Sequence, residues 1–206
     1  GRHLAWTALK RPNFEADRRA ILQLALPTGT QREVAADWDR SASEFVFSAD
    51  GKTLYTQADD LGQHRVFAID VASGKATALT GDGHVGGFDI LGNTFVYALD
   101  SLNAPADLYL AALGAATKPK RLTDVNADRL AGVQFGDYEQ FSFPGWHKEI
   151  VHGYVMKPWN YHKGKKYPVA FIVHGGPQGS MGNDFHYRCN PAIYAGMGYP
   201  VVFIAF

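Results

Sequence analysis

The stretch VAFIVHGGPQGSMGNDF, residues 169–185, joins a run of apolar residues to a loop rich in glycine. The apolar run VAFIVH is typical of a strand that is covered on both faces in a parallel sheet. Ligands of such sheets bind beyond the carboxyl ends of the strands, so chemistry is expected in the loop that follows. Three hypotheses arise: the loop binds a phosphate, it carries a nucleophile at Ser180, or its main chain stabilises a developing charge.

The spacing of the glycines argues against a phosphate-binding loop. A dinucleotide fold requires G-x-G-x-x-G running directly from a strand into a helix. Here Gly175, Gly176 and Gly179 are spaced differently, and Pro177 interrupts them. A P-loop would require Gly-Lys-Ser/Thr, which this loop lacks. We therefore expect no cofactor here.

Ser180 lacks the surroundings of a serine nucleophile. A nucleophile elbow has the pattern G-x-S-x-G on a tight turn between a strand and a helix. Gln178 occupies the position of the first glycine, and Ser180 lies well past the end of the strand. The other serines of the chain also lie outside such a pattern, so the sequence shows no candidate nucleophile.

The third hypothesis uses the main chain of His174, Gly175, Gly176 and Pro177. In α/β-hydrolases, the loop after the third strand supplies a backbone N–H to the oxyanion hole. Glycine suits this role because a Cβ would restrict φ and block the close approach of the main chain. One such donor contributes about 3 to 4 kcal/mol to transition-state stabilisation. The alternative is that the two glycines only form a tight turn.

The elements around the loop predict an α/β unit. Residues 139–159 are typical of a β-hairpin, and residues 199–206 form a second buried apolar strand. Between the loop and this strand, Asn190 suits a helix N-cap, Pro191 the first helical position and Gly198 the position after the helix. Strand, loop, helix and strand predict a βαβ unit of a parallel sheet.

The first part of the chain carries a different pattern, made of short strands and turns. GKTLYTQADD, starting at Gly51, aligns with GNTFVYALDS, starting at Gly92, with an offset of 41 residues. A repeat near 40 residues with Asp-Gly and Ser-Gly turns favours β-propeller blades over helical repeats. About two and a half blades are expected, which predicts that the chain is a segment of a longer protein. The alternative is a small independent β-sandwich.

Composition excludes several other classes of function. The chain has 20 basic and 20 acidic residues, so no charge excess favours nucleic acid. No stretch approaches the roughly 20 apolar residues of a membrane span. Cys189 is the single cysteine, and the spacing of the histidines predicts no metal site.

The sequence resembles the prolyl oligopeptidase family of serine peptidases. The resemblance rests on three segments near the C-terminus: VHGYVMKPWNY (residues 151–161), YPVAFIVHGGPQG (167–179) and FHYRCNPAIYAGMGYPVVFIAF (185–206). RPNFEADRR (11–19), WDR (38–40) and FSADGKTLY (47–55) resemble the late propeller blades of the same family. Within the family, the chain is most similar to bacterial dipeptidyl peptidases and acylaminoacyl peptidases.

This resemblance implies a β-propeller segment (late blades) over residues 1–135 and the N-terminal part of an α/β-hydrolase domain over residues 136–206. The chain is then expected to end before the Ser-Asp-His triad and to be inactive alone. The full-length protein is expected to release dipeptides or acyl-amino acids from peptide N-termini. An esterase with a propeller, or a non-catalytic propeller binding module, are the alternatives.

The resemblance also assigns residues. Gly176 is expected to donate the oxyanion N–H, Gly175 to shape the turn, and His174 to replace a tyrosine of other branches without acting as a base. Glu15 and Asp17 are weaker candidates for binding the α-ammonium group of the substrate. The expected partners are a peptide substrate, the remainder of the same polypeptide and, in the full-length enzyme, a second copy as a homodimer. A periplasmic or secreted location is favoured.

Overall fold

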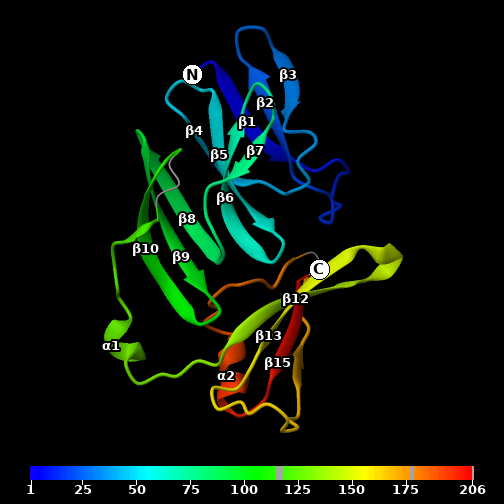
Figure 1. The fold of residues 1–206 in the computed structure, drawn as a ribbon. Helices are drawn as coiled ribbons and strands as arrows, with labels where there is room; N and C mark the ends of the chain where they lie inside the picture. The colour runs from blue at the N-terminus through cyan, green and yellow to red at the C-terminus, as the bar shows by residue number, and fades with distance from the viewer. Residues whose placement is uncertain (115–117, 177–178, 206) are drawn as a thin grey trace.

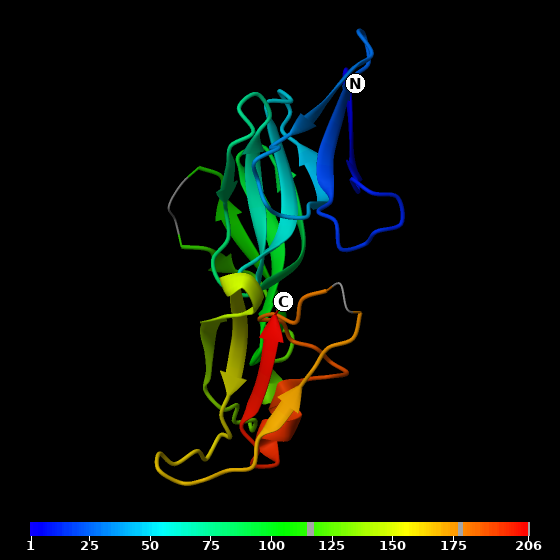
Figure 2. The ribbon, with the colours of Figure 1, turned by 90° about the vertical axis from the view of Figure 1, so that its right-hand side faces the viewer.

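The regular secondary structure of the described residues consists mainly of β-strands. A computed structural model describes residues 1–114, 118–176 and 179–205 (Figure 1). The strands form an N-terminal sheet, a larger sheet made of two repeated units, and a C-terminal sheet. Figure 2 places the C-terminal sheet at one end of the molecule and the other two sheets at the opposite end.

The first two sheets consist of antiparallel meanders, in which strands pair in chain order. The N-terminal sheet contains β1 (His3–Ala8), β2 (Ala20–Ala25) and β3 (Thr30–Val34). The first meander contains β4 (Ser43–Phe47), β5 (Thr53–Asp60), β6 (Gln63–Asp70) and β7 (Ala76–Ala78). The second meander contains β8 (His84–Leu91), β9 (Thr94–Ser101), β10 (Ala104–Ala112) and β11 (Lys120–Arg121).

The sequence repeat corresponds to these two meanders. The second strand of each begins at Thr53 and at Thr94, with the same offset as the aligned sequence segments. The meanders are joined by a parallel pairing of His64 with His84. Repeated four-stranded antiparallel units of this kind are the elements from which propellers are built.

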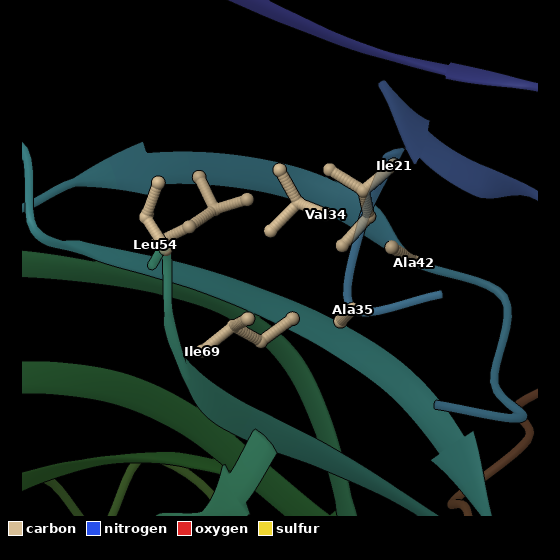
Figure 3. Close-up of a cluster of buried hydrophobic side chains, with 7 residues drawn as sticks. Ile21, Val34, Ala35, Ala42, Leu54 and Ile69 are labelled. Carbon is tan, nitrogen blue, oxygen red and sulfur yellow. The ribbon is translucent and has the colours of Figure 1, made fainter. Parts of the chain in front are cut away.

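A shared core fastens the N-terminal sheet to the first meander. Ile21 and Val34 come from the N-terminal sheet, and they pack against Leu54 and Ile69 of the first meander (Figure 3). Each of these side chains is at most 1% exposed. Full burial of such a side chain stabilises the fold by about 1.5 to 3 kcal/mol. A second cluster joins the two meanders, and it is formed by Val66 of the first meander with Val85, Phe95 and Tyr97 of the second.

The C-terminal sheet combines a hairpin with a parallel pair. Its strand order is β12, β13, β15, β14, with bounds Tyr138–Pro144 for β12, Ile150–Met156 for β13, Ala170–Ile172 for β14 and Val201–Ala205 for β15. β12 and β13 form the predicted hairpin, closed by the 3-10 turn η1 (Trp146–Lys148). β14 and β15 are parallel, and α2 (Pro191–Gly196) connects them, as the predicted βαβ unit requires.

The ends of α2 follow the signals in the sequence. The side chain of Asn190 accepts a hydrogen bond from Ala192 N at 2.8 Å, and Pro191 is the first helical residue. Gly198 adopts a φ of 94° just beyond the C-cap. A second helix, α1 (Ala127–Leu130), lies between β11 and β12. Within the described parts of the chain, no helix is long and apolar enough to cross a membrane.

One expectation for the C-terminal sheet is wrong in the described structure. β14 is short and lies at the edge of the sheet, and it is not covered on both faces. Ala170 and Ile172 pack into the cluster beneath α2, whereas Phe171 is 58% exposed. Successive side chains of a strand point to opposite faces. The described residues therefore cover one face of β14 and leave the other open.

We expect Leu54→Ala to destabilise the full-length protein by about 2 to 5 kcal/mol, because it opens a cavity in the shared core. Leu91→Ala is the matched control, since Leu91 is 87% exposed and its truncation should cost about 0.5 kcal/mol or less. Urea denaturation followed by circular dichroism measures both. Equal effects of the two substitutions would contradict this core.

Candidate active site

The glycine-rich loop leaves the carboxyl end of β14 and runs toward the meanders (Figure 2). Gly176 adopts a φ of 140°, a conformation that side-chain-bearing residues rarely adopt. Gly175 and Gly176 are both exposed. Pro177 and Gln178 lie outside the described residues. The described main chain therefore presents the two glycines at the edge of the sheet where ligands of parallel strands bind.

His174 is oriented by the loop itself. Its Nδ1 lies 2.9 Å from the carbonyl oxygen of Gly175. A carbonyl oxygen only accepts hydrogen bonds, so Nδ1 carries the proton and donates it. This contact ties the imidazole to the turn that it precedes.

Ser180 lies beside a cavity where the loop meets the meanders. The cavity has a volume of about 260 Å³ and is lined by Asp59, Gln63, His64, His84, Ser180, Gly182, Asn183 and Asp184. These residues come from the first meander, the second meander and the loop. The loop therefore continues from the two glycines into the interface between the meanders and the C-terminal sheet, which we call the seam.

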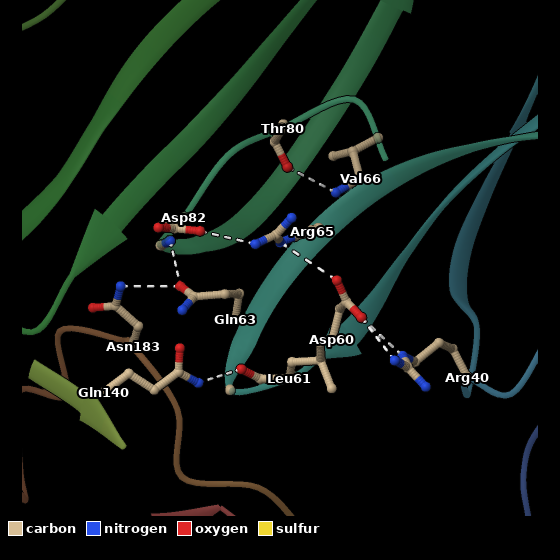
Figure 4. A network of polar contacts seen from close by, with 12 residues as sticks. Arg40, Asp60, Leu61, Gln63, Arg65, Val66, Thr80, Asp82, Gln140 and Asn183 are labelled. Carbon is tan, nitrogen blue, oxygen red and sulfur yellow. Dashed lines mark hydrogen bonds and ion pairs between the residues drawn. The ribbon is translucent and has the colours of Figure 1, made fainter. Parts of the chain in front are cut away.

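Buried amides hold the loop at the seam. Asn183 is 4% exposed and donates from Nδ2 to Oε1 of Gln63 at 3.0 Å (Figure 4). Its Oδ1 accepts from the backbone N–H of Leu102 at 3.1 Å. Gln63 begins β6, and Leu102 lies in the turn between β9 and β10. Both meanders thus contact the same side chain of the loop.

Ion pairs stabilise the β5–β6 hairpin, which carries Gln63. Arg65 lies 2.8 Å from Asp82 and 3.6 Å from Asp60. Arg40 lies 2.8 Å from the same Asp60 carboxylate (Figure 4). This chain of alternating charges links β6 to the segment before β4 and to the turn before β8.

Histidines and carboxylates gather at the seam next to these amides. His84 Nδ1 lies 3.0 Å from Asp100, and His64 Nδ1 lies 2.7 Å from Asp59. The two imidazole rings are 5.1 Å apart. The hydrogen bond to Asp100 raises the pKa of His84, and the nearby Asp184 and Asp59 add to this effect. Burial raises the pKa of Asp184.

The predicted ammonium-binding residues lie in a different part of the chain. Asp17 accepts hydrogen bonds from the Arg11 guanidinium, with 3.0 Å between Nε and Oδ1. These bonds lower the pKa of Asp17. Arg11 also stacks over the ring of Phe14 at 3.7 Å. Glu15 is exposed. Asp17 is therefore engaged by a cation of its own loop, and the roles of Glu15 and Asp17 stay predictions.

Sequence reasoning did not select the amides and histidines of the seam. Gln63 follows an ordinary Leu-Gly turn, and Asn183 follows an unremarkable glycine. Gln63 and Asn183 are hydrogen-bonded to each other but lie 120 residues apart in the sequence, so no local sequence pattern indicates their contact. Among the residues that the structure describes, no three histidines, cysteines or acids are grouped so as to hold a metal ion.

Solved structures with the same fold are peptidases. An acylaminoacyl peptidase from Pyrococcus horikoshii matches 99% of the chain with a TM-score of 0.78 at 22% identity, and the chain covers 30% of it. Porphyromonas gingivalis dipeptidyl peptidase 4 matches 98% of the chain with a TM-score of 0.68 at 18% identity, and the chain covers 29% of it. At these identities the matches show that the chain shares its fold with parts of both proteins.

Two curated relatives are more similar in sequence, and both are named dipeptidyl-peptidase 5. Dipeptidyl-peptidase 5 of Schizosaccharomyces pombe is 30% identical over 206 residues, or 98% of the chain. Dipeptidyl-peptidase 5 of Trichophyton equinum is 32% identical over 209 residues. The chain spans 29% and 28% of these two proteins. Both are fungal, so the expected bacterial subgroup stays a prediction. No protein-family model matches the sequence.

The His84–Asp100 pair generates a pH-dependent prediction. Because Asp100 raises the pKa of His84 above its ordinary value of 6.5, the folded protein binds this proton more tightly than the unfolded chain. The stabilisation is therefore complete below pH 6.5 and is lost as the pH rises through the raised pKa. We expect His84→Gln to lower the Tm of the full-length protein at about pH 5.5, and to lower it less at about pH 9.

Asp100→Asn is the control for this prediction. Asparagine can still accept the hydrogen bond that Phe185 N donates to Asp100 at 2.7 Å, but it carries no charge to attract the imidazolium. In this background, the difference between the effects of His84→Gln at the two pH values should be smaller, because only Asp184 and Asp59 remain to raise the pKa of His84. A His84→Gln effect in the unaltered background that is independent of pH would refute the assignment.

Proposed function

We propose that the chain is part of a serine-type peptidase that releases dipeptides or acyl-amino acids from peptide N-termini. In this proposal the meanders are late blades of a β-propeller, and β12 to β15 are the first strands of an α/β-hydrolase domain. The remainder of the polypeptide would supply the Ser-Asp-His triad. The similarity to dipeptidyl-peptidase 5 over 98% of the chain supports this substrate class.

The position and conformation of Gly176 carry the proposal. Gly176 follows the strand that runs parallel to β15, and it has a φ that favours glycine. In the reaction, a serine attacks the scissile carbonyl, and a histidine transfers its proton to the leaving amine. The carbonyl oxygen becomes negatively charged, and the Gly176 N–H donates a hydrogen bond to it. Gly175 allows the turn, and His174 fixes its orientation.

The full-length protein tests the reaction class directly. We expect it to hydrolyse dipeptidyl or N-acyl-aminoacyl p-nitroanilides. Hydrolysis of p-nitrophenyl esters without hydrolysis of the amides would favour an esterase. Binding of peptides without any hydrolysis would favour a propeller binding module. Either result would refute the proposed peptidase.

We expect Gly176→Ala to lower kcat of the full-length enzyme by about 100-fold or more with little change in KM, because loss of one oxyanion donor has this effect. A Cβ at a φ of 140° forces the main chain to rotate and moves the N–H. Gly179→Ala is the matched control, since a Cβ there meets no atom within 4 Å and its φ is not in the left-handed region. Similar kinetics for both variants would exclude the oxyanion role.

The ammonium-binding role of Glu15 has its own test. Glu15→Ala should raise KM for dipeptide amides with a free α-amino group far more than for the same substrates with a blocked amino group, because only the free group carries the charge. Glu44→Ala, another exposed glutamate, serves as control. Equal changes in KM for both substrates would remove Glu15 from the site.

A further inference from the structure

We propose that Asn183 is a positioning residue for the oxyanion loop, and that Gln63 holds it in place from the first meander. By the oxyanion loop we mean the described residues 173–176 and 179–182, between β14 and Asn183. This inference rests on the proposed function, because it concerns the loop that carries Gly176. In this proposal the meanders affect the reaction indirectly, because their hydrogen bonds to Asn183 fix the C-terminal end of the oxyanion loop.

The backbone N–H, the side-chain Nδ2 and the side-chain Oδ1 of Asn183 each make a hydrogen bond across the seam. Its backbone N–H donates to the carbonyl oxygen of Gly62 at 2.9 Å. Its side chain contacts Gln63 at 3.0 Å and Leu102 at 3.1 Å, through Nδ2 and Oδ1 respectively. The residue is 4% exposed. Loss of one of these partners is therefore unfavourable, because a buried polar group has already given up its hydrogen bonds to bulk water.

The amide of Gln63 has one permitted orientation. Its Oε1 accepts from Asn183 and also from the backbone N–H of Gly83 at 2.7 Å. Its Nε2 donates to the hydroxyl oxygen of Tyr154 at 2.6 Å, and that hydroxyl donates to the carbonyl of Gly62 at 2.9 Å. Rotating the amide by half a turn would set two donors against each other at Gly83 and Asn183. The network therefore specifies where Asn183 lies.

The main chains at this point are in direct contact. A Cβ on Gly182 would lie 2.6 Å from the carbonyl oxygen of Gly62. A Cβ on Gly62 would lie 2.8 Å from the side-chain nitrogen of Gln140, which donates to the carbonyl of Leu61. The loop thus rests on the β5–β6 turn without intervening side chains. A displacement of either segment is transmitted to the other, because close-packed groups have little room to yield.

The oxyanion loop depends on such anchors because its glycines have no side chains to pack. A Cβ on Gly175 would meet nothing within 4 Å. The loop is fixed on one side by β14, and on the other by Met181, which packs into the cluster beneath the sheet, and by Asn183. Productive geometry requires catalytic groups to be held within about 0.5 Å. Release of Asn183 would free one end of the segment that carries the Gly176 N–H.

The expected kinetic signature follows from when the oxyanion forms. The donor interacts most strongly with the transition state, so a displaced N–H lowers kcat and leaves ground-state binding nearly unchanged. A displacement of about 1 Å is enough to reduce the rate by about 100-fold. Substitution of a residue that only stabilises the fold would lower the fraction of active enzyme. It would leave kcat and KM, expressed per active site, unchanged.

The test compares Asn183→Ala and Asn183→Asp with Asn103→Ala in the full-length enzyme. Asn103 is a matched control, because it lies in the same β9–β10 turn as Leu102 and, among the described residues, its Oδ1 accepts only a local bond from Ser101 at 3.3 Å. With active enzyme counted by titration, we expect both Asn183 variants to lose about 10- to 100-fold in kcat with KM within about twofold. Asn103→Ala should keep both constants. A loss confined to KM, or equal loss in the control, would overturn the proposal.

A double-mutant cycle that combines Gln63→Ala with Asn183→Ala tests whether Gln63 acts through Asn183 or whether each residue affects kcat independently. If Gln63 acts through Asn183, the double variant should lose little more kcat than Asn183→Ala alone. Multiplied losses would show that the two residues act separately and would contradict the proposed hold of Gln63 on Asn183.

Hydrogen exchange provides a readout that does not require activity. In the free full-length protein, Asn183→Ala should speed exchange of the amides of residues 173–176 and 179–182 at least tenfold, whereas Asn103→Ala should not. Unchanged exchange would overturn the positioning role. If the unaltered protein hydrolyses no peptide amide, the proposed function fails, and the exchange measurement still decides whether Asn183 holds the loop.

Discussion

The hydrogen bonds of the Gln63 side chain link the large sheet to the C-terminal sheet and to the loop that carries Gly176. The amide contacts the loop at Asn183, the C-terminal sheet at Tyr154 and the turn before β8 at Gly83. These partners come from three different elements, and their bonds have fixed directions. A hydrophobic contact between Leu102 and the cluster of the C-terminal sheet supports the same seam, but apolar packing alone would allow sliding. The amide sets the register between the meanders and the loop that carries Gly176.

The fold could be predicted to the extent that it depends on neighbours in the sequence. The offset between Thr53 and Thr94 reflects equivalent strands, because each meander is closed by short turns with recognisable residues. The start of α2 followed from Asn190 and Pro191 for the same reason. The expectation that β14 is covered on both faces was wrong for the described residues, which leave Phe171 exposed. An apolar run indicates that a strand can be buried, but which elements cover its faces is decided by distant parts of a chain.

The candidate site divides in the same way. Gly176 is a candidate from the sequence because a close approach of the main chain after a parallel strand favours glycine, and its φ of 140° is one that glycine readily adopts; its role stays a prediction. Asn183, Gln63, His84 and Asp100 could not be selected, since each is an ordinary turn or strand residue until the fold brings it to its partner. Contacts between distant turns produce no periodic pattern in the sequence, so the polar network of the seam can be recognised only in the three-dimensional structure.

The separation of the seam partners along the chain also has a consequence for the order of folding. Strands of each meander are close in sequence, and they can pair soon after they are made. β15 must insert between β13 and β14 before the C-terminal sheet is complete, and such long-range pairing is slow. Until then, the amide of Gln63 and the carbonyl of Gly62 remain hydrated in an exposed turn. We therefore expect docking of the two ends of the molecule to be a late event, in which water leaves that turn and the loop that carries Gly176 acquires its final shape.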